Sequence, residues 1–186
     1  MNLVHRLYCR STRWRWRLRD LLPWATDSLQ LDGARVLELG SGPGLTTDWL
    51  RPRVGSLTAV EYDEADAAAL RERAPDVEVH HADAAELPLA DEVFDAVVCF
   101  TMLHHVPTRD LQDQLFAEAR RVLRPGGVFA GSDSRWGPLF AVAHWGDILQ
   151  LVDPDELPDR LRDTGFEAVT VDCKRDVFRF HAVTPH

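Results

Sequence analysis

A glycine-rich turn is the feature of the sequence with the clearest chemical meaning. Residues 36–44 read VLELGSGPG, and Gly40, Gly42 and Gly44 stand where an apolar strand gives way to an amphipathic helix. Glycines there let the backbone approach a ligand closely, and the helix that follows offers free N–H groups. A nicotinamide-binding turn would read G-x-G-x-x-G, but here Leu45 stands in the place of the third glycine. The turn predicts a ligand site of another kind, the alternative being a tight turn that binds nothing.

Two carboxylates follow the next strands at positions where ligands bind. Glu61 ends the second predicted strand, 21 residues after Gly40, and a carboxylate there can accept both hydroxyls of a ribose. Asp83 follows the third strand and can accept a hydrogen bond from an exocyclic amine such as that of adenine. The alternatives are a solvated surface residue at Glu61 and a helix N-cap at Asp83.

Short apolar runs alternate with amphipathic stretches along the chain, which predicts βαβ units and a largely parallel sheet. The predicted strands are Ala34–Leu39, Ser56–Glu61, Val77–His81, Phe94–Phe100, Val128–Ser132, Phe166–Asp172 and Val177–Val183. The predicted helices are Leu45–Arg51, Glu64–Ala74, Arg109–Leu123 and Pro154–Thr164. The last two strands are joined so briefly that they must be antiparallel. We expect an α/β, Rossmann-like, doubly wound fold with a mostly parallel seven-stranded sheet and one antiparallel strand near its edge.

The N-terminal residues lie outside this pattern. Apolar residues at helical spacing predict a helix over Asn2–Leu22 that ends at Pro23, followed by a short second helix over Trp24–Leu29. We expect residues 1–33 to form a helical cap and residues 34–186 to form the main domain.

The charge of the chain is unevenly distributed. The 186 residues suit one domain and carry a net charge of −9. Residues 1–31 hold six arginines against two aspartates, a net charge of +4, which leaves −13 on the remainder. An acidic body does not attract phosphate backbones, so the composition argues against general nucleic-acid binding.

The cysteines and the lengths of the apolar runs indicate in which cellular compartment the protein works. Cys9, Cys99 and Cys173 form no CxxC pair, so neither a disulfide framework nor a metal site is predicted. No apolar run approaches the roughly 18–20 residues that span a bilayer. We expect a cytoplasmic protein.

Four segments in order resemble the class I S-adenosylmethionine-dependent methyltransferases. They read VLELGSGPG, AVEYD, HADAAELPLADEVFDAVVCFTMLHHV and RVLRPGG, and the resemblance covers about Ala34 to Asp133. It is strongest to the small-molecule branch that includes the ubiquinone and menaquinone C-methyltransferases. The resemblance implies S-adenosylmethionine as the cofactor and S-adenosylhomocysteine as its product.

The resemblance also implies roles for single residues. Glu38 and the turn (Gly40, Ser41, Gly42, Pro43, Gly44) would hold the methionine part of the cofactor. Glu61 would take the ribose hydroxyls, with Tyr62 beside the adenine and with Asp83 and Ala84 at the adenine edge. Phe100 would offer backbone contacts near the methionine. A smaller or polar residue is more common there, so we expect the Phe100 side chain to shape the pocket.

Methyl transfer is an in-line displacement that needs alignment of donor and acceptor and a deprotonated nucleophile. His105 follows the fourth strand at the methyl end of the cofactor, and histidine titrates near neutral pH, so His105 is the candidate base. The alternative is that the LHHV segment only closes the pocket. In relatives the connection after the fifth strand forms part of the substrate wall, where we expect Trp136, His144 and Trp145; the alternative is a core helix. We also expect His104, after the fourth strand, to contact the substrate.

The class of methyl acceptor is inferred mainly from motifs that the sequence does not contain. No N/D-P-P-Y/F follows the fourth strand, which disfavours methylation of nucleobase amines, and no Pro-Cys pair is present to attack a pyrimidine ring. We expect a small-molecule acceptor methylated at O, N or C. The alternatives are an RNA-modifying enzyme that uses the Arg/Trp-rich segment Arg13–Arg17 and a non-catalytic cofactor-binding sensor or partner subunit. That segment could also pack on the domain, cover the substrate or lie on a membrane surface; the oligomeric state stays open.

Overall fold

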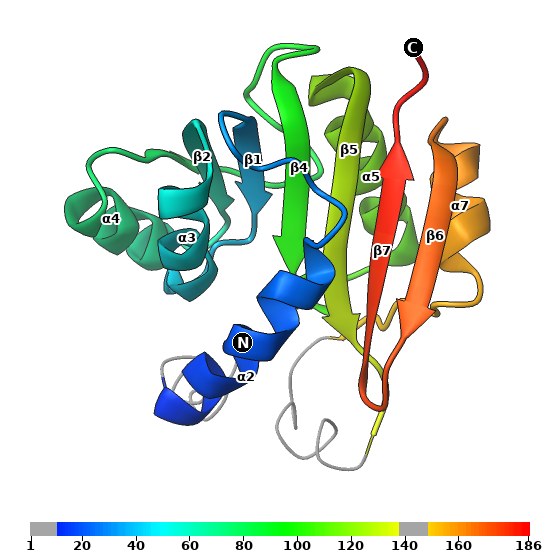
Figure 1. Cartoon of the computed structure of the whole chain (residues 1–186), viewed down its shortest axis with the longest axis horizontal. Helices are drawn as coiled ribbons and strands as arrows, with labels where there is room; N and C mark the ends of the chain where they lie inside the picture. The colour runs from blue at the N-terminus through cyan, green and yellow to red at the C-terminus, as the bar shows by residue number, and fades with distance from the viewer. Residues whose placement is uncertain (1–10, 138–148) are drawn as a thin grey trace.

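A seven-stranded sheet forms the centre of the molecule (Figure 1). The structure is a computed structural model that describes residues 11–137 and 149–186. The strands are β1 (Arg35–Leu39), β2 (Ser56–Glu61), β3 (Glu78–His81), β4 (Phe94–Phe100), β5 (Leu123–Ser134), β6 (Glu167–Cys173) and β7 (Val177–Val183). Their order across the sheet is β3-β2-β1-β4-β5-β7-β6.

The strand directions confirm the predicted sheet. Strands β3, β2, β1, β4 and β5 pair in parallel. Strand β7 lies antiparallel to both β5 and β6, so it is the reversed strand next to the edge. The chain changes direction across the sheet between β1 and β4, and open α/β sheets bind ligands at the carboxyl ends of the strands at such a point.

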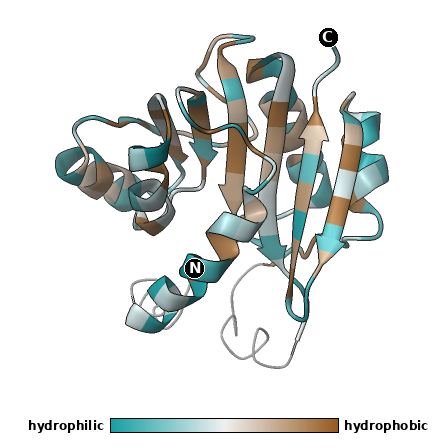
Figure 2. Ribbon diagram, viewed as in Figure 1, coloured by the Kyte–Doolittle hydropathy of each residue, from teal (hydrophilic) through white to brown (hydrophobic). Residues whose placement is uncertain are grey.

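Helices cover both faces of the sheet, and each face has its own core. On one face α5 (Arg109–Val122) and α7 (Leu157–Asp163) pack over a cluster that includes Leu37, Val97 and Cys99. On the other face α2 (Thr12–Ala25), α3 (Leu45–Leu50) and α4 (Glu64–Arg73) pack over Val36 and Val98. Neighbouring residues of β1 and β4 thus enter opposite cores, as the period of a strand requires. Strand β4 is hydrophobic over most of its length (Figure 2).

Several predicted boundaries are wrong; for example, the last helix, α7, begins at Leu157 and not at Pro154. Helix α2 does not end at Pro23 but continues to Ala25. Leu22 and Ala25 are buried there, and Thr26 donates from both its N–H and its hydroxyl to the Leu22 carbonyl, at 3.1 and 2.7 Å. No second helix follows, because residues 26–28 form a turn.

The fifth strand begins earlier than the sequence predicts. It starts at Leu123 rather than Val128 and includes the segment Pro125–Gly127. Gly126 has a φ of +72°, and the register with β4 shifts between Phe94 and Ala96. The glycine-rich segment is therefore a bulge inside the strand and not a break before it.

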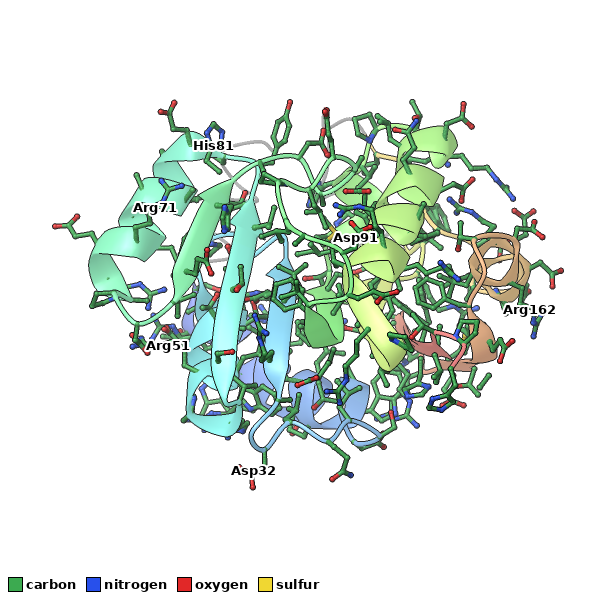
Figure 3. The ribbon with its side chains drawn as sticks, turned by 90° about the horizontal axis from the view of Figure 1, so that it is seen from above. Asp32, Arg51, Arg71, His81, Asp91 and Arg162 are labelled. Atoms are coloured by element: carbon green, nitrogen blue, oxygen red, sulfur yellow. The ribbon has the colours of Figure 1, made fainter. Side chains whose placement is uncertain are left out.

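The cap helix is joined to the C-terminal hairpin. Leu18, Leu21 and Leu22 of α2 are buried in the second core, and Arg17 forms an ion pair with Asp176 at 2.6 Å. Arg179 on β7 donates to the Trp24 carbonyl at 2.5 Å. The N-terminal segment thus shares a core with the rest of the molecule, while its division at residue 33 stays a prediction. Other charged side chains, among them Asp32 and Arg162, lie on the outside of the fold (Figure 3).

Candidate active site

The glycine turn follows β1 at the point where the strand order changes direction. Gly40, Gly42 and Gly44 have φ values of +70°, +51° and +80°, which other residues adopt only with strain. A Cβ added to Gly40 would lie 2.9 Å from side-chain carbons of Met102, so the turn packs directly against the loop after β4. At Gly42 a Cβ would meet nothing within 4 Å. The turn is therefore packed against Met102 at Gly40, whereas the space beside Gly42 is empty of protein atoms.

Glu38 connects the strand before the turn to the helix after it. The carboxylate is 1% exposed and accepts hydrogen bonds from the hydroxyls of Thr46 and Thr47, the latter at 2.6 Å. Burial raises the pKa of Glu38 to about 7, although the two hydroxyls oppose the rise. Its contacts are thus with α3, and a direct contact with the methionine part of the cofactor stays a prediction.

Glu61 lies at the end of β2 beside the turn. Its side chain accepts the Gly42 N–H on Oε2 at 2.6 Å and the Asp63 N–H on Oε1 at 2.9 Å. Burial raises the pKa of Glu61, and these two N–H groups oppose the rise. Glu61 is 8% exposed, so it is not the solvated surface residue of the alternative. Each carboxylate oxygen retains a lone pair that can accept a ribose hydroxyl.

The predicted adenine residues follow β2 and β3. Tyr62 is 74% exposed directly after Glu61. Asp83 is exposed, and its Oδ1 accepts the Ala85 N–H at 2.9 Å in a turn. No helix begins there, so Asp83 is not a helix N-cap. Ala84 is buried in the first core. Adenine binding at these residues stays a prediction.

The end of β4 differs in part from the expectation. The Phe100 side chain is 4% exposed and packs in the second core, so it supports the site from within the core instead of forming an open pocket wall. The next residue, Thr101, has a φ of +53°, a strained conformation for a β-branched residue. Its N–H donates to the Ser132 carbonyl at 2.7 Å. The sequence did not point to Thr101, because a threonine gives no sign in the sequence that its φ will be positive.

The two histidines form a short 3-10 helix, η2 (Leu103–His105), next to the turn. His104 is 2% exposed; its Nδ1 lies 2.5 Å from Asp133 Oδ1 and its backbone N–H donates to Asp133 Oδ2 at 3.0 Å. The His105 ring is half-buried and its centroid lies 4.2 Å from that of the His104 ring. His104 is therefore an interior residue held by Asp133, and His105 is the more open of the two.

Asp133 was missed at the sequence level. It is 1% exposed at the end of β5 and also accepts the Ser134 N–H at 2.5 Å. The available signal was an acidic residue at the carboxyl end of a buried parallel strand, where ligand sites form.

A second buried group holds η2 from the side of α5. Gln112 is fully buried, and its Nε2 donates to the carbonyls of Leu103 at 3.1 Å and Gln150 at 2.7 Å. Arg160 on α7 donates to Gln112 Oε1 at 3.0 Å and pairs with Asp113 at 2.7 Å. The signal in the sequence was a glutamine on the apolar face of a helix, three and four residues before Leu115 and Phe116.

The remaining predicted residues are less constrained. Trp136 is 71% exposed after β5, and His144 and Trp145 lie outside the described residues. In the parts of the chain that the structure describes, no three His, Cys, Asp or Glu side chains gather as metal ligands. Burial raises the pKa of the Cys99 thiol well above its usual value, so this cysteine is not a nucleophile.

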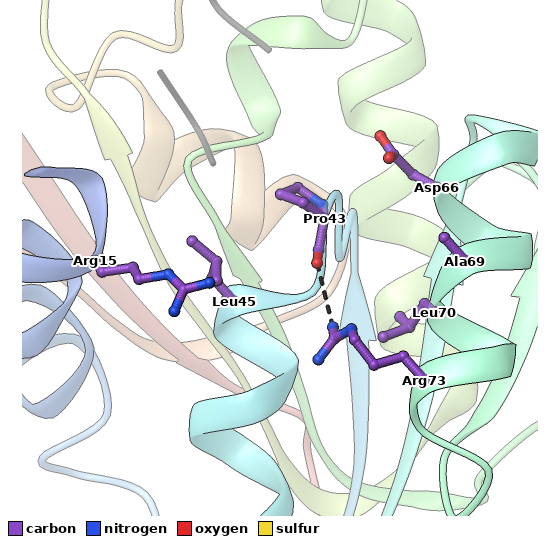
Figure 4. A pocket seen from close by; sticks show the side chains of 7 residues that line it. All are labelled: Arg15, Pro43, Leu45, Asp66, Ala69, Leu70 and Arg73. Atoms are coloured by element: carbon purple, nitrogen blue, oxygen red, sulfur yellow. Dashed lines mark hydrogen bonds between the residues drawn. The ribbon is translucent and has the colours of Figure 1, made fainter. Parts of the chain in front are cut away.

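A cleft of about 380 Å³ adjoins the glycine turn on the side of α2 and α4 (Figure 4). Arg73 of α4 crosses it and donates to the Pro43 carbonyl at 3.2 Å and to Asp48 at 2.5 Å. Leu45 and Arg15 line its other side. Of the predicted cofactor residues only Pro43 lines this cleft, so the predicted cofactor residues do not gather there.

Comparison with known proteins agrees with this geometry. A family model described as a methyltransferase domain matches residues 37–131. A probable S-adenosylmethionine-dependent methyltransferase of Mycolicibacterium smegmatis is 42% identical over 97 residues, which are 52% of this chain and 37% of that protein. The ubiquinone biosynthesis O-methyltransferase of Pseudomonas paraeruginosa is 31% identical over 189 residues, covering 89% of this chain and 79% of that protein. The crystal structure of a Pyrococcus horikoshii protein superposes with a TM-score of 0.79 at 20% identity, over 95% of this chain and 93% of that one.

The strand order, the glycine turn and the carboxylate at the end of β2 are typical of nucleoside-binding α/β proteins. With the family match, the chain belongs to the class I S-adenosylmethionine-dependent methyltransferases. It spans half or less of the length of the mycobacterial relatives that it matches.

Proposed function

We propose that this protein transfers the methyl group of S-adenosylmethionine to a small-molecule acceptor at oxygen, nitrogen or carbon. The observation that carries the proposal is the hydrogen bond from the Gly42 N–H to Glu61, which joins the glycine turn to the predicted ribose-binding carboxylate. The names of the relatives, including an O-methyltransferase, support it.

The residues present fit this cofactor. The open space above Gly42 admits a ligand close to the backbone. Ser41 Oγ is buried and has no hydrogen-bond partner among the described residues, so it has capacity for a ligand. Glu61 keeps a lone pair on each oxygen for the ribose hydroxyls. When bound, the cofactor supplies a methyl group that is already activated on a sulfonium.

We assign the base to His105. It is half-buried at the carboxyl edge of the sheet, where a nucleophile must approach. Asp133 holds the neighbouring His104 through both ring and backbone, which fixes the position of the short helix. The proposed acceptor contacts are His104, Trp136, His144 and Trp145. His104 is buried, so we propose that it lies behind the surface that the acceptor meets.

Titration with S-adenosylhomocysteine tests the proposal. At 100-fold excess over its dissociation constant the ligand stabilises the protein by about 2.7 kcal/mol. For a chain of this size that raises the melting temperature by about 5–11 °C. Glu61→Ala should lose most of the shift, because the ribose hydroxyls lose their acceptor; Glu64→Ala, an exposed residue of α4, should keep it. No shift at saturating ligand would contradict the proposal.

Two other readings have their own tests. A non-catalytic sensor would bind S-adenosylhomocysteine yet release no product with any acceptor fraction from a cell extract. An RNA-modifying enzyme would bind RNA with an affinity that falls steeply with salt. None of the helices in the described parts of the chain is long and apolar enough to cross a membrane. We propose a cytoplasmic location, supported by the free thiols of Cys99 and Cys173.

A further inference from the structure

Helix α2 has an outer face that its packing does not explain. Leu18, Leu21, Leu22 and Ala25 face the core. On a helical period of 3.6 residues, Arg13, Trp16 and Asp20 lie on the opposite arc, with Arg15 and Arg19 on its flank, and all five are exposed. The apolar face accounts for the docking of the cap, so the outer face needs a separate reason.

The arginines of this outer face form no ion pair with the part of the chain that the structure describes. Arg17, which lies on the inner side, pairs with Asp176. Among the described residues no carboxylate forms an ion pair with Arg13, Arg15 or Arg19. Trp16 is 65% exposed, and the Arg19 guanidinium lies 4.3 Å from its ring centroid. The outer face thus combines an exposed indole with three guanidinium groups and one carboxylate, that of Asp20, which leaves it with a net positive charge.

Exposed aromatic residues gather at one end of the molecule. Within residues 11–137 and 149–186, the large hydrophobic side chains that are exposed are Trp16, Tyr62 and Trp136. Tyr62 follows the carboxyl end of β2, and Trp136 follows the carboxyl end of β5. The arrowheads of β4 and β5 point to the end of the molecule at which α2 begins (Figure 1). Because β1 and β4 lie between β2 and β5, the two strands that Tyr62 and Trp136 follow are about 14 Å apart across the sheet.

We propose that this end of the molecule docks on the surface of an anionic lipid bilayer. We call it the Arg/Trp rim and define it by Arg13, Arg15, Trp16, Arg19, Tyr62 and Trp136. Tryptophan and tyrosine are enriched at membrane interfaces, and arginines on an amphipathic helix bind anionic headgroups. The chain beyond residues 1–31 carries −13, so the anionic surface repels that part of the molecule and orients the rim toward the bilayer.

A bilayer fits the rim better than a nucleic acid does. Single-stranded nucleic acids stack successive bases on aromatic residues along one positively charged groove. Of the three rim aromatics, Trp16 lies on α2, Tyr62 directly follows β2 and Trp136 follows β5. They are therefore spread over one end of the molecule, as contact with a flat surface requires, and do not line one groove. The consequence rests on the proposed function: the acceptor would be an amphipathic molecule with an apolar part held in the bilayer.

The test is co-sedimentation of the full chain with phosphatidylcholine vesicles, with and without phosphatidylglycerol. We expect binding only to the anionic vesicles, with an affinity that falls as salt is added. Arg13→Gln and Arg15→Gln should each weaken binding about fivefold, and Trp16→Ser should weaken it as well. The matched controls are Arg35→Gln, at the exposed start of β1, and Trp49→Phe on α3. The Arg53 guanidinium lies 4.2 Å from the centroid of the Trp49 ring. Both controls should bind as the wild type does.

Several results would overturn the docking proposal. They are absence of binding to anionic vesicles, equal binding to both vesicle types, and equal loss in Arg15→Gln and Arg35→Gln. Binding of a single-stranded RNA that depends on Arg15, without vesicle binding, would assign the rim to nucleic acid. Titration with S-adenosylhomocysteine on the same samples separates the two proposals, because ligand binding needs no vesicle and vesicle docking needs no cofactor.

Discussion

At the scale of single residues, the candidate site depends on side chains that hold the backbone in place. Glu38 joins β1 to α3 through two threonine hydroxyls, and Asp133 holds His104. Thr101 keeps a positive φ directly after β4. Such strained or buried polar positions persist only where the surroundings determine them.

Glu38 should make stability depend on pH. Its pKa is about 7 in the folded state, above that of an unfolded glutamate, so the folded protein binds the extra proton. The stability that this proton provides is present below about pH 4.5 and is lost as pH rises through 7. We expect the unfolding free energy of the wild type, relative to Glu38→Gln, to fall by about 3 kcal/mol between pH 4.5 and 8. Urea denaturation of both proteins across this range measures it; a constant difference would contradict the assignment.

Gly42 and Gly33 form a matched pair that separates ligand binding from backbone strain. Both have positive φ values, +51° and +73°, and a Cβ on either would meet nothing within 4 Å. Alanine at either position should cost about 1 kcal/mol of stability. Only Gly42→Ala should weaken S-adenosylhomocysteine binding, because its Cβ would fill the space over the turn. Calorimetric titration of both variants decides this, and an equal loss of affinity would place the ligand elsewhere.

At the scale of elements, a buried polar group fixes η2 against α5 and α7. Gln112 bonds the backbone of η2 and of residue 150, while Arg160 reaches it from α7. The neighbouring elements η2 and α5 are therefore held in one arrangement with α7, which is distant in sequence, beside the proposed acceptor position.

Gln112→Leu should destabilise the protein by about 2 kcal/mol, because the Gln150 carbonyl loses its buried donor and Arg160 loses an acceptor. The control is Gln114→Leu on the same helix, which is exposed and should change stability by less than about 0.5 kcal/mol. Chemical denaturation compares the two variants. Equal effects would show that the buried amide is not the cause.

At the scale of the whole molecule, the cap and the C-terminal hairpin hold each other. Arg179 on β7 pairs with Asp27 at 2.6 Å and with Asp172 at 3.0 Å, beside its bond to Trp24. One guanidinium thus connects the residues after α2 to the last two strands.

Arg179→Met should loosen the cap before the rest of the fold. We expect faster amide hydrogen exchange in α2 and a stability loss of about 2 kcal/mol, with little change in the amides of β1 and β4. Arg162→Met, in an exposed pair with Asp159 on α7, is the control and should leave exchange in α2 unchanged. Uniform acceleration over the whole sheet would contradict a local role for Arg179.

The sequence predicted the fold well because the signals were periodic and local. Alternating apolar and amphipathic segments located the sheet, and the short link between Cys173 and Val177 required the antiparallel pair. The end of α2 and the start of β5 were missed, because buried leucines outweigh Pro23 and a glycine bulge continues the pairing.

The site was predictable only in part. The glycine turn and Glu61 carry their chemistry in residue type and spacing, and they do lie together. Asp133 and Gln112 acquire their roles from contacts across 29 and 38 residues of chain, which no local pattern reports. The assignments of residues to the methionine, ribose and adenine parts of the cofactor, to the acceptor and to the base all stay predictions.

The position of β7 has a consequence for how the chain folds. Strand β6 comes before β7 along the chain, yet β7 fills the place between β5 and β6. Strand β6 therefore has no neighbour in the sheet until the later strand has inserted. The edge of β5 stays unpaired over the same interval, and an open edge invites association with other chains. We expect insertion of residues 177–183 to be a late, long-range step that limits the folding rate, and partly folded chains to aggregate through β5.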